Sequence, residues 1–261
     1  MKANNSSIPP LLVLDGARAL VTGAGRGIGT SIAHRLAAHG ARVALAYRCS
    51  RAGAEQAAAT IRAHGGTAIT VGGADLGDEA EARRIVDETL AGLGGLDILV
   101  NNAAGLGPLK RLDEATWQNI DDEWQTVVRP VVTLTRAALP HFAAQRHGRI
   151  VNLAATLLQR PAPTYGAHAM AKAAVLAYTR TLAREVGAQN ITVNAVSPGM
   201  TLTEISQNLP DDQKRTVAER TPLRRLATPD DVAGAVVFFC SPLADFVTGA
   251  NIAPDGGLAV L

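Results

Sequence analysis

The sequence predicts a single α/β domain built on one sheet of about seven parallel strands with helices on both faces. Short, β-rich apolar runs alternate with amphipathic stretches along the chain, and continuous apolar runs are typical of strands buried on both faces. Strands joined by helical crossovers pair in parallel. No linker or change in composition divides the 261 residues. These observations predict one doubly wound, Rossmann-fold domain.

Each predicted element follows from its own pattern. Runs rich in aliphatic residues predict strands at 18–22, 42–47, 67–72, 96–101, 149–153, 191–196 and 251–254. Apolar residues at helical spacing predict helices at 27–39, 52–64, 79–93, within 113–144, at 165–186 and at 230–240. Residues 1–14 are expected to form an N-terminal extension to a Rossmann-fold domain at 15–261.

The stretch 200–228 is rich in polar residues and is expected to be a long loop. A long loop in a compact enzyme is usually either a substrate lid or disordered. In a doubly wound sheet ligands bind at the carboxyl ends of the strands, and this loop follows one of those ends. We therefore favour a lid and expect residues 198–228 to cover a substrate. Leu202, Ile205 and Leu209 indicate that the substrate is an apolar small molecule.

Composition and charge exclude several classes of partner. The formal net charge of +2 argues against nucleic acid or an anionic membrane as a ligand. No segment is long and apolar enough to span a bilayer, and the first residues lack the pattern of a signal peptide. Cys49 and Cys240 are far apart and form no disulfide or zinc pattern. We therefore expect a cytoplasmic protein without a metal site.

A glycine-rich turn follows the first predicted strand and opens the first predicted helix. Glycines allow a tight turn and let backbone N–H groups approach a pyrophosphate at a helix N-terminus. We therefore expect phosphate binding at this turn. The expected cofactor contacts are Gly23, Gly25, Arg26, Gly27, Ile28 and Gly29.

The end of the second predicted strand indicates which dinucleotide binds. An enzyme that reads the NAD ribose usually has an acidic residue there, and this chain has none. Arg48, close to Ser50, can instead grip a 2′-phosphate together with Arg26. The sequence thus favours NADP(H) over NAD(H), and the alternative is that both arginines are surface residues without a ligand.

Further motifs follow the predicted strands in a fixed order. Each is a short run at the carboxyl end of a strand or near the C-terminus. They are Asp75-Leu76, Asn101-Asn102-Ala103, Ser197-Pro198-Gly199 and Asp255-Gly256-Gly257. Together with the glycine-rich turn, this order resembles the short-chain dehydrogenase/reductase family from about Asp15 to the C-terminus.

The resemblance implies a nicotinamide cofactor held by residues that follow several strands. Asp75 and Leu76 are expected at the adenine, and Asn102 and Ala103 along the adenosine. The run after the sixth strand is expected to surround the nicotinamide, with contacts from Pro198, Gly199, Thr201 and Thr203. Family members commonly pair the helix at 165–186 with its copy, so the resemblance also implies a homodimer or homotetramer.

The catalytic pattern of the family is broken in this chain. In most members a Tyr lies four residues before a Lys, and a Ser and an Asn assist it. Lys172 matches the Lys, but His168 stands in place of the Tyr and Ala155 in place of the Ser. Val127 stands in place of the Asn, close to an apparent small insertion around Asp121. Only Lys172, expected at the nicotinamide ribose, remains.

Three functions stay open on this pattern. Tyr165 lies seven residues before Lys172, a spacing similar to that of the enoyl-acyl-carrier-protein reductase branch, and should share a helix face with His168 and Lys172. On that reading Tyr165 holds the enolate oxygen while NADPH reduces an α,β-unsaturated carbonyl compound. Alternatively, His168 protonates a ketone or quinone, or the substrate assists its own protonation. Finally, the chain is a non-redox enzyme (isomerase or cyclase) or a binding protein.

Overall fold

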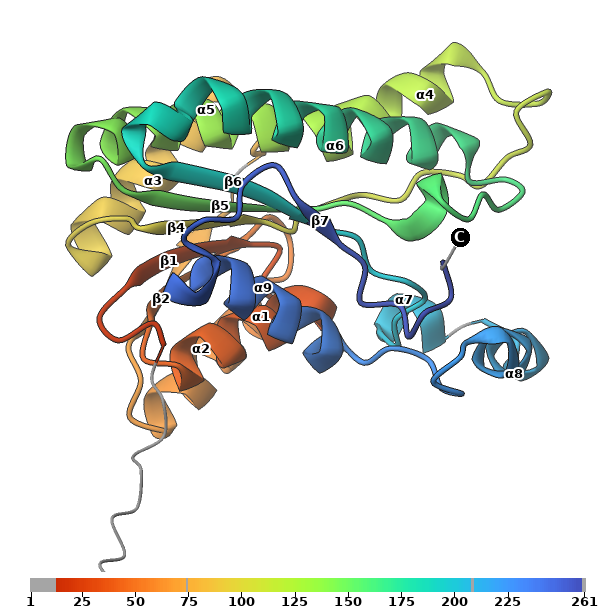
Figure 1. Ribbon diagram of the computed structural model, residues 1–261, viewed down its shortest axis with the longest axis horizontal. Coiled ribbons are helices and arrows are strands. Elements are labelled where there is room, and N and C mark those ends of the chain that lie inside the picture. The colour runs from red at the N-terminus through yellow and green to blue at the C-terminus, as the bar shows by residue number, and fades with distance from the viewer. Residues whose placement is uncertain (1–12, 74, 208, 260–261) are drawn as a thin grey trace, which may run out of the picture.

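The computed structural model describes residues 13–73, 75–207 and 209–259, and its strands form one twisted sheet (Figure 1). All neighbouring strands are parallel, in the order β3-β2-β1-β4-β5-β6-β7. The strands are β1 (Arg18–Thr22), β2 (Arg42–Tyr47), β3 (Ala68–Gly72), β4 (Ile98–Asn101), β5 (Gly148–Leu153), β6 (Ile191–Val196) and β7 (Asn251–Ile252). The predicted doubly wound fold is confirmed, because the strand order reverses between β1 and β4.

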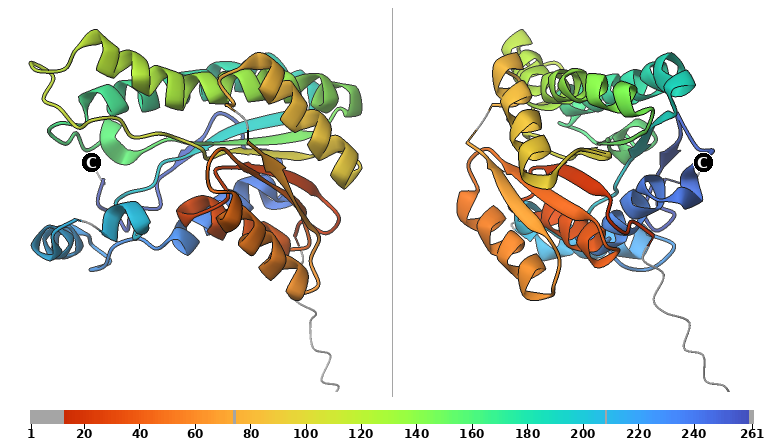
Figure 2. Two further views of the ribbon diagram at one scale, coloured as in Figure 1. Left: turned by 180° about the vertical axis from the view of Figure 1, so that it is seen from behind. Right: turned by 90° about the vertical axis from the view of Figure 1, so that its left-hand side faces the viewer.

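Helices cover both faces of the sheet (Figures 1 and 2). One face carries α1 (Gly27–Ala38), α2 (Arg51–Ala63) and α9 (Pro229–Cys240). The other carries α3 (Glu79–Leu93), α5 (Arg129–Gln145) and α6 (Gly166–Val186). α4 (Trp117–Glu123) runs through one π-helical turn, Trp124–Val128, into α5, and α7 (Glu204–Gln207) and α8 (Asp211–Arg220) follow β6. Within the described residues, no helix is both long and apolar enough to cross a membrane.

The core consists of two apolar layers, one on each face of the sheet. Successive residues of a strand point to opposite faces, so Val43 and Leu45 of β2 pack in the layer under α1 while Ala44 and Ala46 pack in the layer under α3. All four are buried. This double burial is why the strands are continuous apolar runs in the sequence.

Local sequence signals set several helix ends. The Asp78 side chain caps α3 by accepting hydrogen bonds from two backbone N–H groups of its first turn, and Gly94 ends the helix with a φ of 77°. Thr228 and Asp231 form a capping box at the start of α9. The helices thus have defined ends, and the loops that connect them to the strands form the carboxyl edge of the sheet, where the site lies.

The stretch 200–228 is not the continuous loop that the sequence predicts, because it contains α7 and α8. That prediction is wrong for a physical reason. None of the residues of α8 is buried, so the helix lacks the apolar stripe that reveals a helix in a sequence. Asp211 and Asp212 stabilise its first turn, where the helix dipole favours negative charge.

The predicted N-terminal extension is described only at its end. Leu14 lies within the predicted range 1–14, but it is buried and packs against the core on the α1 face. Its N–H donates to the carbonyl oxygen of His39 at 3.0 Å. The domain therefore includes Leu14, and residues 1–12 of the predicted extension lie outside the described residues.

Candidate active site

The turn between β1 and α1 requires glycine at positions where a side chain would collide with the backbone. Gly23 has a φ of 63°, and a Cβ added to Gly29 would lie 2.3 Å from the carbonyl oxygen of Gly23. A Cβ added to Gly25 would lie 2.5 Å from the carbonyl oxygen of Ser50. The turn is thus folded closely on itself and on the end of β2, and only glycine fits.

The N-terminus of α1 suits a pyrophosphate. Arg26, the N-cap residue, makes no side-chain hydrogen bond to the helix, and the first turn carries no acidic residue in this described segment. The first N–H groups of a helix have no partner within the helix, and the helix dipole favours an anion there. The residues of the helix terminus therefore fit the phosphates of a dinucleotide. An acidic side chain lies near this terminus, since Oε2 of Glu204 is 3.3 Å from where a Cβ on Gly27 would be.

Asn102 and Ala103, which are expected along the adenosine, lie against this turn. The Thr22 hydroxyl oxygen accepts hydrogen bonds from the backbone N–H groups of both residues, each at 2.9 Å. The Asn102 side-chain amide donates to the carbonyl oxygen of Thr22 at 2.8 Å. These bonds join the carboxyl ends of β1 and β4 and hold the glycine-rich turn in position.

The two predicted phosphate-binding arginines are available to a ligand. Arg26 and Arg48 are exposed, and neither forms an ion pair with another described residue. Arg51, in contrast, pairs with Glu55 at 2.7 Å between Nε and Oε1. Ser50 donates from its hydroxyl to the carbonyl oxygen of Gly25 at 3.2 Å, so this residue secures the turn.

Asp75 and Leu76 lie at the carboxyl end of β3. Asp75 is exposed, and its Oδ1 accepts the N–H of Gly77 at 2.9 Å, while the N-cap of α3 is Asp78. Leu76 packs against the apolar layer under α3 and α5. Asp75 therefore shapes its own loop and leaves one carboxylate oxygen, Oδ2, without a hydrogen-bond partner among the described residues.

The segment Pro198–Thr203 returns from β6 to the glycine-rich turn. The Thr201 hydroxyl donates to the carbonyl oxygen of Gly199 at 3.0 Å. A Cβ added to Gly27 would lie 3.4 Å from Cγ2 of Thr203. The predicted nicotinamide end of the site thus adjoins the predicted phosphate end, and both face the carboxyl edge of the sheet.

Lys172 is buried at the end of β5. Its side chain extends from α6, and Nζ donates to the carbonyl oxygen of Leu153 at 2.7 Å. Burial lowers the pKa of Lys172 to about 8, although the negative charge of Glu123 acts in the opposite direction. The structure therefore places a buried ammonium group beside the strand end where the nicotinamide ribose is expected.

His168 is bonded to a buried carboxylate that the sequence analysis did not identify. Its Nδ1 lies 2.7 Å from Oε2 of Glu123, and the side chains are 13% and 4% exposed. The other carboxylate oxygen of Glu123, Oε1, accepts the N–H of Gly107 at 2.7 Å. Burial raises the pKa of Glu123, but the bonds from His168 and Gly107 and the charge of Lys172 outweigh it, so this pKa is below its usual range.

The positions of the usual Asn and Ser carry no acid or base, and Tyr165 lies apart from His168 and Lys172. Val127 is buried in an apolar cluster with Ala171 and Val175, and Ala155 follows β5 at the start of a short 3₁₀ turn. Tyr165 lies at the N-cap of α6 and lines a cavity with residues of the next two turns of that helix, Ala169 and Met170 among them. His168 and Lys172 do not line this cavity. The three residues therefore do not share one environment, as their spacing predicted, because Tyr165 alone lies at the cavity.

The cavity beside Tyr165 has a volume of about 710 Å³ and mostly apolar walls. They come from the loop before α4, the loop after β5 and the first turns of α6. Arg111 and Asp113 are its charged lining residues, and they pair at 3.0 Å between Nε and Oδ1. An uncharged apolar group is the ligand that suits such walls.

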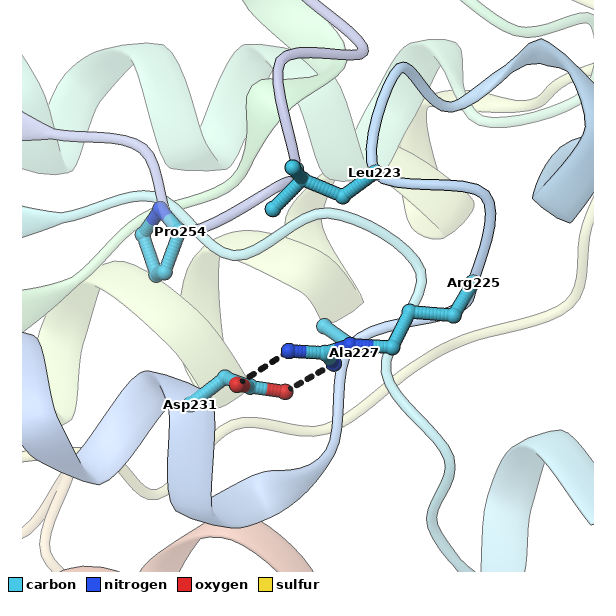
Figure 3. A pocket seen from close by; sticks show the side chains of 6 residues that line it. Leu223, Arg225, Ala227, Asp231 and Pro254 are labelled. Atoms are coloured by element: carbon cyan, nitrogen blue, oxygen red, sulfur yellow. Dashed lines mark hydrogen bonds and ion pairs between the residues drawn. The ribbon is translucent and has the colours of Figure 1, made fainter.

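A second cavity of about 210 Å³ lies at the start of α9 and is lined in part by Leu223 and Pro254. Figure 3 shows that its arginine, Arg225, points at Asp231 and forms two contacts with it. Asp231 also belongs to the capping box of α9. The charges in this cavity thus stabilise the chain and are not free for a ligand.

Comparisons with known proteins decide the family. A family model described as "Enoyl-(Acyl carrier protein) reductase" matches residues 23–259. The 3-oxoacyl-[acyl-carrier-protein] reductase FabG of Staphylococcus epidermidis is 35% identical over 242 residues, which cover 92% of this chain and 98% of the relative. This chain belongs to the short-chain dehydrogenase/reductase family. The resemblance predicted from the sequence motifs is confirmed.

Short-chain dehydrogenases/reductases of the same fold differ in activity. A short-chain dehydrogenase of Burkholderia cenocepacia, solved in complex with NADP, is 38% identical with a TM-score of 0.85, over 94% of this chain and 99% of that one. A putative gluconate dehydrogenase of Agrobacterium tumefaciens is 30% identical with a TM-score of 0.90, over 96% and 99%. Membership makes the chain one of a family of oxidoreductases and leaves the substrate to be argued from the site.

Glu123 is the site residue that sequence reasoning missed. It lies 45 residues before His168, and no local spacing links the two. One signal was present, because the apparent insertion around Asp121 falls beside the π-helical turn at Trp124–Val128. Such turns accommodate an extra residue in a helix and are frequent at functional sites.

Proposed function

We propose that this short-chain dehydrogenase/reductase is an NADP(H)-dependent reductase of ketone groups in which His168 provides the proton. The observation that carries the proposal is the buried contact between His168 and Glu123, one helical turn before Lys172. Nδ1 of His168 is bonded to the carboxylate, and Nε2 has no hydrogen-bond partner within the described residues. An imidazole held in this way can act as a general acid.

The cofactor proposal rests on the phosphate-binding end of the site. The α1 N-terminus suits the pyrophosphate, and Arg26 and Arg48 supply guanidinium groups for a 2′-phosphate where an NAD-binding enzyme has an acid. The NADP in the Burkholderia relative supports the same choice. Lys172 would hold the ribose hydroxyls of the nicotinamide, and the bound nicotinamide supplies the hydride.

The residues of the chain account for the proton. His168 gives the proton on Nε2 to the oxygen that becomes the alcohol, while the proton on Nδ1 stays bonded to Glu123. The ring is then neutral, and its partial exposure of 13% lets it regain a proton from water. The ammonium group of Lys172 favours the negative charge that develops on the substrate oxygen. No serine is needed, which agrees with Ala155.

A second candidate is reduction of an α,β-unsaturated carbonyl or thioester with Tyr165 and Lys172. It is favoured by the position of Tyr165 on the apolar cavity of about 710 Å³ and by the description of the matching family model. On this candidate the Tyr165 hydroxyl holds the enolate oxygen, and His168 has no direct part. In both candidates the segment 198–228 is proposed to cover an apolar small-molecule substrate.

We also propose that the protein is a homodimer or homotetramer. Trp117, Trp124 and Met170, on the α4 and α6 side of the molecule, are 83%, 45% and 42% exposed. Large exposed apolar side chains of this kind are typical of a surface that another chain covers. Analytical ultracentrifugation of the purified protein tests this assembly.

The deciding experiment measures NADPH consumption with acetoacetyl-CoA, with aryl ketones and with crotonyl-CoA. We expect turnover of keto compounds that falls about 100-fold or more in His168→Asn and persists in Tyr165→Phe, because loss of a general acid costs that much. Turnover of crotonyl-CoA alone, lost in Tyr165→Phe and kept in His168→Asn, establishes the second candidate. Tight NADPH binding without consumption on any of these compounds overturns both reductase candidates for them and favours non-redox chemistry.

A further inference from the structure

The carboxylate of Glu123 has a separate partner for each oxygen. Oε2 meets Nδ1 of His168, and Oε1 accepts the backbone N–H of Gly107, each at 2.7 Å. The side chain is 4% exposed, so water does not compete for either contact. A buried carboxylate in this arrangement is fully paired, and a change to either partner must affect the other.

We infer that Glu123 is a positioning residue that fixes a proton on Nδ1 of His168 and leaves Nε2 as the atom that exchanges a proton with the substrate. The inference rests on the proposed role of His168 as the proton donor. An ionised carboxylate can only accept hydrogen bonds, so the ring nitrogen facing it must carry hydrogen. The orientation and tautomer of a catalytic histidine are commonly set in this way by the partner of its other nitrogen.

The position of Glu123 depends on the π-helical turn that follows it. α4 ends at Glu123, and the turn Trp124–Val128 joins it directly to the first residue of α5. Val127, in the place of the usual Asn, packs into the apolar cluster with Ala171 and Val175. The carboxylate of Glu123 therefore lies one helical turn before Val127, the position of the usual Asn, and it contacts His168 from the end of α4.

Glu123 also connects the proton donor to the loop between β4 and α4. Gly107, which donates to Oε1, belongs to this loop, and so do Arg111 and Leu112 of the apolar cavity. A Cβ added to Gly107 would lie 3.2 Å from Oε1, so the loop backbone and the carboxylate are in close contact. A substrate that displaces this loop would act on His168 through the same carboxylate.

Glutamine cannot reproduce both contacts of Glu123. Its side chain has one acceptor oxygen and one NH₂ donor. If the oxygen keeps the N–H of Gly107, the NH₂ group faces Nδ1 of His168, and the ring must carry its proton on Nε2. If the amide is turned the other way, the Gly107 contact is lost. Glu123→Gln therefore either reverses the tautomer of His168 or releases the loop.

The test is ¹⁵N NMR of the protein labelled at histidine, which distinguishes protonated from unprotonated ring nitrogens without substrate or cofactor. His168 is assigned by the signal that disappears in His168→Asn. We expect the neutral ring to carry hydrogen on Nδ1 in the wild type and on Nε2 in Glu123→Gln. Asp121→Asn, an exposed acid on the same helix, is the matched control and should leave the spectrum unchanged.

Kinetics separate failure of this inference from failure of the proposed function. We expect Glu123→Gln to lower kcat about 100-fold with KM for NADPH unchanged, and Asp121→Asn to keep both. Wild-type kcat in His168→Asn overturns the proposed proton donor. Loss in His168→Asn with full kcat in Glu123→Gln overturns the inference alone, as does a wild-type ring protonated on Nε2. If Glu123→Gln fails to fold, Glu123→Asp takes its place. Aspartate keeps the negative charge, but its side chain is shorter, so it must lose the hydrogen bond to Nδ1 of His168.

Discussion

Replacing Lys172 with methionine should change how the stability of the protein depends on pH. The pKa of Lys172 is about 8 against an ordinary 10.5, because burial disfavours its ammonium form. Between these two values the unfolded chain keeps the proton while the folded chain has lost it, so the free energy of unfolding rises with pH. At about 1.4 kcal/mol for each pH unit, the rise amounts to about 3 kcal/mol.

Methionine has similar length and no proton to lose, so Lys172→Met lacks this rise. Urea denaturation from pH 7 to 10.5 should therefore show the wild type gaining about 3 kcal/mol relative to the variant. The variant also loses the hydrogen bond to the carbonyl oxygen of Leu153, which offsets its whole stability curve by about 1–3 kcal/mol without producing a rise with pH. Loss of the Lys172 charge also removes one cause that lowers the pKa of Glu123, but this carboxylate titrates in acid, below the interval measured, and the remaining groups are common to both proteins.

Lys110→Met is the matched control, because Lys110 is exposed in the loop before α4. Its stability curve should run parallel to that of the wild type across the same interval. Parallel curves for the wild type and Lys172→Met would refute the reasoning, since they would mean that water reaches the ammonium group of Lys172 in the folded protein.

Three further predictions concern the cofactor turn and the sheet. Gly29→Ala should abolish NADPH binding measured by fluorescence, because its Cβ would lie 2.3 Å from the Gly23 carbonyl oxygen, whereas Gly187→Ala, with no atom within 4 Å, should bind normally. Arg48→Ala should weaken NADPH binding roughly tenfold and leave NADH binding unchanged; equal losses would contradict a 2′-phosphate contact. Asp97 is half-buried, which raises its pKa, but its arginine partner on β1, Arg18, outweighs this and lowers the pKa. The pair therefore stabilises the fold above the ordinary pKa of 3.8 and loses this effect as the pH falls. Asp97→Asn should lower the free energy of unfolding by about 1–3 kcal/mol at pH 7 and reduce its decrease at acid pH, measured by urea denaturation. An unchanged decrease at acid pH would contradict a stabilising ion pair at Asp97.

The fold was predictable because its signals are local. The helix at 79–93 and the strand at 191–196 match the structure at both ends, since each is a full-length periodic or apolar run bounded by a capping residue or a turn. The glycine-rich turn was predictable for the same reason. α8 was not, because an exposed polar helix has no apolar stripe and is stabilised by its context.

The candidate site was predictable only in part. The motifs indicated Lys172 and the absence of the usual Ser, Tyr and Asn, because these positions have fixed spacing. The contact between Glu123 and His168 depends on how α4 packs against α6, and no pattern within either segment contains that information. Tyr165 lies at the N-cap of α6, where helical spacing no longer governs side-chain direction, so its separation from His168 also required the structure.

The π-helical turn at Trp124–Val128 illustrates how a longer helix can bring a positioning residue such as Glu123 to a site. One extra residue in a regular helix rotates everything after it by about 100° and would turn the buried face of α5 toward water. A wide turn absorbs that rotation within five residues, so the packing of α5 is preserved. Insertion then becomes a route to altered chemistry that leaves the scaffold intact, and searches based only on substitutions at aligned positions will overlook residues such as Glu123.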